Sequence, residues 1–78
     1  MDHIEKKVKK IISQQLSVMP EDIHNKSLLI EDLGSDSLDN VELIMNLEDK
    51  FNIEIQDEEA EKFNTVQSII TFIKNKVS

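Results

Sequence analysis

The alternation of apolar and polar residues near the start of the chain predicts an amphipathic helix. Apolar residues recur three or four positions apart, with lysines between them: Ile4, Val8, Ile11, Ile12 and Leu16. Because Pro20 cannot continue a helix, we expect this one to run from about residue 3 to about residue 16. We assign it a structural role in the core.

A long connection follows, from residue 17 to residue 35, and contains Pro20, Asn25 and Gly34. A connection of this length without structure is unusual in a small domain. Apolar residues recur within it: Ile23, Leu28, Leu29, Ile30 and Leu33. We therefore expect the segment to lie against the core with one short helical turn, as ordered loops with a function often do.

The stretch from Ser37 to Phe51 predicts a helix with two apolar faces. At about 100° per residue, one side carries a normal core stripe of Leu43, Ile44, Leu47 and Phe51. The opposite side carries Leu38, Val41 and Met45, and acidic residues flank them: Glu42, Glu48 and Asp49. Since one small core cannot bury both faces, the second is predicted to be a docking surface rather than chance exposure.

The last third of the chain predicts one short and one long helix. An extended link through Ile53 and Ile55 precedes a brief helix from about Asp57 to Phe63. Thr65 can cap a final helix with apolar residues at helical spacing: Val66, Ile69, Ile70, Ile73 and Val77. The expected fold is all-α, a small four-helix bundle of three main helices and one short helix, forming a single domain over residues 1–78.

Composition and charge narrow the possible functions. The 78 residues include no cysteine, so any thiol must come from an attached group. No apolar run approaches the ~20 residues of a membrane span and the start lacks a signal-peptide core, so we expect a cytoplasmic protein. Between residues 21 and 61 there are fourteen Asp and Glu but only two Lys, within a net charge of −7. This acidic middle argues against nucleic-acid binding and favours positively charged protein partners.

Enzymatic and metal chemistry have little support in the sequence. "GSDSLD" has Asp39 where a hydrolase nucleophile turn needs glycine, and the only histidines are His3 and His24. A calcium loop fails in both registers, because its third position would fall on Gly34 or Leu38. We expect no catalytic residues and no dedicated metal site.

Ser37 is the remaining candidate for chemistry. Asp36 is well placed as a helix N-cap, with Asp39 three residues later as a capping-box acid. Ser37 would then be the first helical residue, its hydroxyl in solvent where the helix dipole favours a phosphoryl group. From these residues alone, a modified serine and a serine that only belongs to the cap both remain open.

The segment "EDLGSDSLDNVELIMNLEDKF", residues 31–51, closely resembles the signature of bacterial acyl carrier proteins, in which D-S-L marks the serine that carries 4′-phosphopantetheine. The resemblance extends over nearly the whole chain, through "VKKIISQQL", "EIQDEEAEKF" and "TVQSI". It implies a non-enzymatic, monomeric carrier. Its Ser37 would be loaded from coenzyme A by a holo-acyl-carrier-protein synthase and would hold growing fatty acyl chains as thioesters.

The resemblance also implies roles for other residues. Fatty acid synthesis enzymes and acyltransferases would dock through basic patches onto Asp36, Leu38, Asp39, Val41, Glu42, Met45, Glu48 and Asp49. The acyl chain would fold back into a pocket lined by Leu47, Ile55, Ala60 and Phe63. The sequence departs from the family pattern at Ser35, Asn40, Gln56, Phe63 and Phe72.

Two other interpretations stay open. One is a carrier for a different cargo, such as a polyketide, an aminoacyl group or a specialised lipid precursor. The other is an acidic helical adaptor that only binds proteins, in which Ser37 would be dispensable.

Overall fold

The structure is a computed structural model that describes residues 3–77, with every side chain in that range except that of Ser37. It contains α1 (His3–Leu16), a single 3-10 turn η1 (Pro20–Asp22), α2 (Ser37–Phe51), α3 (Asp57–Ala60) and α4 (Val66–Val77). Leu28 and Thr65 form an isolated antiparallel bridge, and residues 3–77 contain no β-strand. The predicted all-α fold of three main helices and one short helix is confirmed.

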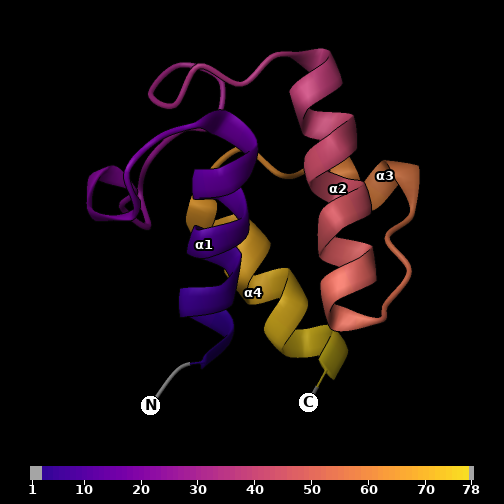
Figure 1. The fold of residues 1–78 in the computed structure, drawn as a ribbon. Helices are drawn as coiled ribbons and strands as arrows, with labels where there is room; N and C mark the ends of the chain where they lie inside the picture. Colours follow the sequence, from indigo (N-terminus) through magenta and orange to yellow (C-terminus); the bar gives the residue numbers. More distant parts are fainter. Residues whose placement is uncertain (1–2, 78) are drawn as a thin grey trace.

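α1 is the central helix and packs against both α2 and α4. Figure 1 shows α1 and α2 running in opposite directions, with α4 crossing them obliquely and α3 beside α2. The apolar stripes of the three long helices meet in one core with residues from the connections: Val8, Ile11, Ile12, Ile23, Leu29, Leu43, Leu47, Ile55, Val66, Ile69, Ile70 and Ile73. Burial of these side chains is the main favourable term for so small a fold.

The long connection between α1 and α2 is attached to the chain around the start of α4. The N–H of Leu29 donates to the carbonyl of Asn64 at 3.0 Å, and the N–H of Val66 donates to the carbonyl of Ser27 at 3.1 Å. Ile23 and Leu29 are buried, as predicted. Ile30 is 62% exposed, so its predicted place against the core is wrong. The turn that places Leu29 inward directs the next side chain outward.

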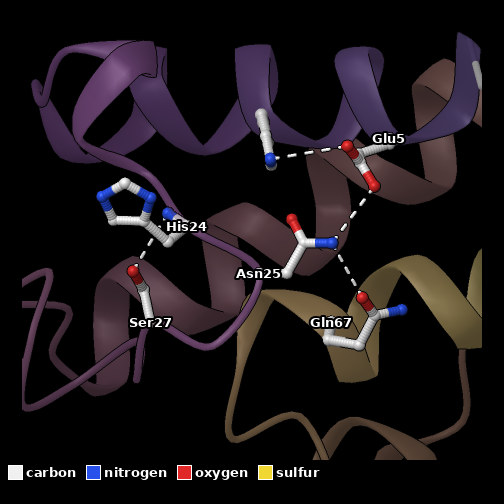
Figure 2. Close-up of polar contacts among 6 residues, drawn as sticks. Glu5, His24, Asn25, Ser27 and Gln67 are labelled. Atoms are coloured by element: carbon white, nitrogen blue, oxygen red, sulfur yellow. Dashed lines mark hydrogen bonds and ion pairs between the residues drawn. The ribbon is translucent and has the colours of Figure 1, made fainter.

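Asn25 joins the loop to two helices through its side-chain amide, as Figure 2 shows. Its Nδ2 donates to Oε1 of Glu5 on α1 at 3.2 Å and to Oε1 of Gln67 on α4 at 2.8 Å. Close by, the backbone N–H of His24 donates to Oγ of Ser27 at 3.0 Å. These contacts order the loop where its apolar residues are few.

The helix ends follow from local chemistry. α2 ends at Phe51, and the next residue, Asn52, is its C-cap in a left-handed conformation with φ of 53°. Thr65 caps α4, since the N–H of Ser68 donates to its Oγ1 at 3.2 Å, as predicted. α3 is shorter than predicted, because the N–H groups of Lys62 and Phe63 bond three residues back and tighten the chain out of the α-helix. None of the helices in the described range is long and apolar enough to cross a bilayer.

Candidate functional site

A capping box holds the N-terminus of α2. The N–H of Asp39 donates to Oδ1 of Asp36 at 2.8 Å, and the N–H of Asp36 donates to Oδ2 of Asp39 at a longer 3.4 Å. The predicted N-cap is therefore confirmed, and Ser37 is the first residue of the helix. The predicted exposure of the Ser37 hydroxyl lies outside the described side chains. α2 begins at the end of the molecule opposite to the start of α1 and the end of α4 (Figure 1).

A second polar contact spans the same turn. The buried Ser35 hydroxyl donates to Oδ1 of Asn40 at 2.6 Å, and the backbone N–H of Ser35 donates to the carbonyl of Leu29 at 2.9 Å. Reasoning from sequence missed this pair because both residues read as ordinary cap and helix-surface positions. Two short polar side chains five residues apart across an N-cap were the available signal.

The outward face of α2 exposes the apolar side chains that the helical periodicity placed there. Leu38 is 66% exposed, Val41 55% and Met45 60%. Glu42 and Asp49 are exposed as well. We call Leu38, Val41 and Met45, with these two acids, the outward face; it lies on the helix that begins at Ser37.

Three of the predicted docking acids also have structural hydrogen bonds. Asp36 and Asp39 form the capping box, and Oε2 of the half-buried Glu48 accepts from the backbone N–H of Ile55 at 2.8 Å. This last bond fixes the link from α2 to α3. Glu48 is therefore less free to meet a partner than Glu42.

Comparisons with known proteins agree with this arrangement. Residues 6–73 match the family described as "Phosphopantetheine attachment site". Proteins named "Acyl carrier protein" from Buchnera aphidicola are similar over almost their whole length. The protein of subspecies Baizongia pistaciae (strain Bp) is 61% identical over 77 residues, covering 99% of both chains. That of subspecies Acyrthosiphon pisum (strain 5A) is 59% identical over 76 residues, covering 97% of this chain and 95% of the relative.

The chain belongs to the acyl carrier protein family. The resemblance carried by the D-S-L segment is thereby confirmed, and phosphopantetheine is the prosthetic group of the matched family. The relatives bear the name of carriers rather than of catalysts.

The residues predicted to line an acyl pocket belong to the core of this acyl carrier fold or border it. Leu47 and Ile55 are buried in the core, and Ala60 and Phe63 are partly buried against it. Phe63 also packs edge-on against Phe72, with ring centroids 5.3 Å apart, beside a surface hollow of about 380 Å³. Their role toward an acyl chain stays a prediction.

Charge is segregated in this member of the acyl carrier family. Lys7 and Lys10 of α1 and Lys50 at the far end of α2 surround a hollow of about 350 Å³. Acidic residues dominate from residue 31 to residue 61, which includes all of α2 and α3. Negative charge is therefore concentrated on α2 and α3, and positive charge on α1 and at the end of α2.

Proposed function

We propose that this chain carries growing fatty acyl chains as thioesters on a 4′-phosphopantetheine arm attached to Ser37. The observation that supports this most directly is the D-S-L triplet at the capped start of α2, within a chain of the acyl carrier family. The chain contains no cysteine, so the arm would supply the thiol. One domain, residues 1–78, would do this as a monomer in the cytoplasm.

The start of α2 suits a phosphoryl group. The first N–H groups of an α-helix have no partner within the helix, and its dipole places partial positive charge there. The Asp36 carboxylate accepts from the N–H of Asp39, and Ser37 and Leu38 belong to the same first turn, where helix N–H groups are available to a phosphoryl group. The residues present therefore fit the group.

A holo-acyl-carrier-protein synthase would attach the arm. The Ser37 oxygen forms a bond to the phosphorus that bears the pantetheine, and the bond from that phosphorus to the bridging oxygen of the coenzyme A diphosphate breaks. Adenosine 3′,5′-bisphosphate leaves, and the synthase takes up the serine proton. Once attached to Ser37, the arm would supply a thiol to which the partner enzymes transfer acyl groups, and this chain would perform no catalysis itself.

The outward face of α2 would bind the partners. Leu38, Val41 and Met45 would form the apolar centre of each interface, and the acids around them would meet basic patches on the synthase, the fatty acid synthesis enzymes and the acyltransferases. Rim charges speed encounter more than they add affinity, so a carrier can bind and leave many enzymes quickly. The predicted set is Asp36, Leu38, Asp39, Val41, Glu42, Met45, Glu48 and Asp49.

The acyl chain would be sheltered in the bundle between α2 and α3. The side chains that would line it are Leu47 and Ile55, which are buried in the core, and Ala60 and Phe63, which are partly buried against it. Because these side chains pack in or against the core, an acyl chain would enter only if some of them moved apart.

Intact mass measurement tests the attachment. We expect the purified apo chain, incubated with coenzyme A and a holo-synthase, to gain one phosphopantetheine. Ser37→Ala should gain none, and the control Thr71→Ala, which removes an exposed hydroxyl on α4, should be modified like the wild type. Modification of Ser37→Ala, or an unmodified wild type, would overturn the proposal. If neither the wild type nor Ser37→Ala is modified, the remaining interpretation is an adaptor that binds proteins without a prosthetic group.

A further inference from the structure

The chain before α2 forms a compact turn rather than an open loop. The N–H of Leu28 donates to Oδ2 of Asp32 at 2.7 Å, and the N–H of Leu33 returns to the carbonyl of Leu28 at 3.1 Å. Gly34 continues with φ of 74°, a conformation that favours glycine. The N–H of Ser35 then closes the turn onto the carbonyl of Leu29, whose side chain is buried in the core. The backbone of Ser35 is thus held by a hydrogen-bonded turn that is anchored on the core through Leu29.

The Ser35 side chain joins this hydrogen-bonded turn to the first turns of α2. Ser35 is only 3% exposed, and its hydroxyl donates a short 2.6 Å hydrogen bond to Oδ1 of the half-buried Asn40. The carbonyl of Asp36 is a second, longer contact of the same hydroxyl at 3.4 Å. Ser37 lies between Ser35 and Asn40 in the chain. The N–H of Asn40 also donates to the carbonyl of Asp36 at 2.9 Å, so both the main chain and a side-chain bond fix this segment.

We propose that Ser35 and Asn40 are a positioning pair that orients Ser37 for phosphopantetheine transfer. This inference rests on the proposed function. The capping box has one good bond and one of 3.4 Å, which is at the weak limit of hydrogen bonding. Helix ends fray, and a serine on a fraying first turn spends part of its time in orientations that cannot react. The partly buried hydrogen bond from Ser35 to Asn40 restricts those orientations.

The consequence concerns the chemical step more than docking. Neither Ser35 nor Asn40 belongs to the outward face, so removing their bond leaves the apolar centre and acidic rim in place. Loss of orientation at a reacting oxygen lowers the rate of the bound complex, because small misplacements of reacting groups have large effects on rate. The pair should therefore act on kcat of the synthase reaction and leave KM nearly unchanged.

Steady-state kinetics of a holo-synthase on variants of the full chain test this inference. Ser35→Ala and Asn40→Ala should each lower kcat by about 3- to 10-fold, and the double variant should lose no more than the worse single change. Asn40→Asp keeps an acceptor oxygen for the Ser35 hydroxyl and should retain nearly the wild-type kcat.

Ser13→Ala is the matched control. Its hydroxyl also makes a 2.6 Å bond to the chain beside a helix end, to the carbonyl of Val18 after α1, far from Ser37 in sequence. It should cost a similar amount of thermal stability and leave kcat unchanged. If Ser35→Ala and Asn40→Ala change kcat no more than Ser13→Ala, or if Asn40→Asp loses as much as Asn40→Ala, the positioning role is overturned.

These outcomes are separate from failure of the proposed function. If the wild type accepts phosphopantetheine at Ser37 and Ser35→Ala and Asn40→Ala react equally fast, only the proposed positioning pair is wrong. If the wild type is not modified at Ser37, the carrier function itself fails. Circular dichroism on each variant shows whether it is folded at the assay temperature; Asn40→Asp, which preserves the hydrogen bond, gives a folded comparison should Asn40→Ala unfold.

Discussion

α2 presents apolar side chains on two opposite faces, and the two faces have different surroundings. Leu43 and Leu47 are at most 1% exposed against α1 and the rest of the core. Leu38 and Met45, on the same helix and of similar size, are more than half exposed. The inward residues contribute stability by leaving water, at about 25 cal/mol per Å² of apolar surface. The outward residues stay more than half exposed and contribute much less to stability, and we propose that a partner covers them.

The acidic residues of α2 divide in a similar way. Glu42 is exposed, whereas Glu48 is half-buried and accepts the backbone N–H of Ile55. Two glutamates that look equivalent on a helical wheel therefore differ in what their removal would do. Glu48 lies between the buried and the exposed face of α2. Variants of α2 can show which residues contribute to stability and which to partner binding.

Truncation of the inward face should have the largest effect. Leu47→Ala removes a fully buried side chain from the core and should lower the free energy of unfolding by about 2–5 kcal/mol. Urea denaturation followed by circular dichroism measures this. Leu38→Ala is the same chemical change on the outward face and should alter stability by less than about 0.5 kcal/mol. Equal losses for the two leucines would refute the division of the helix.

Removal of the Glu48 carboxylate should come next. Glu48→Ala leaves the N–H of Ile55 without its acceptor and should cost about 1–3 kcal/mol of stability in the same urea experiment. Glu48→Gln keeps an acceptor oxygen and should lose less. Glu42→Ala removes an equal charge from an exposed position, and a loss as large as that of Glu48→Ala would show that charge rather than the Ile55 bond matters.

The cap of α2 should give a smaller loss. Asp36→Ala removes the acceptor of the Asp39 N–H and should destabilise the fold by about 1 kcal/mol. Asp36→Asn retains a capping oxygen but not the charge, so it should keep the stability and lose only the electrostatic part of synthase binding. Thermal melts compared with salt-dependent synthase kinetics separate the two. A destabilised Asp36→Asn would mean that the charge, not the cap, stabilises this end.

Met45→Ala should change stability least. Because Met45 is 60% exposed, its truncation should shift the free energy of unfolding by no more than about 0.5 kcal/mol. As an apolar contact at the centre of the interface, it should raise KM for the holo-synthase by about 5- to 10-fold. A normal KM together with a reduced free energy of unfolding would show that Met45 stabilises the fold and does not bind the synthase.

The helices and the division of α2 could be predicted because they depend on periodicity. The bounds of α1 and α2, the Thr65 cap and the exposure of Leu38, Val41 and Met45 all follow from local spacing and capping chemistry. Contacts between residues distant in sequence could not be predicted in this way. The bonds of Asn25 to Glu5 and Gln67, and of Glu48 to Ile55, depend on how the helices pack. Ile30 was misplaced for the same reason, since its orientation is set by a turn that closes onto Leu29.

Amide chemical-shift mapping with an added holo-synthase tests most directly whether the outward face is the working surface. The account predicts that the largest perturbations fall on the first turns and outward positions of α2, from Ser37 through Leu38, Val41 and Glu42 to Met45. The lysines of α1 and the buried positions of α4 should shift little. Perturbations concentrated on Lys7, Lys10 and Lys50, with α2 unaffected, would contradict it.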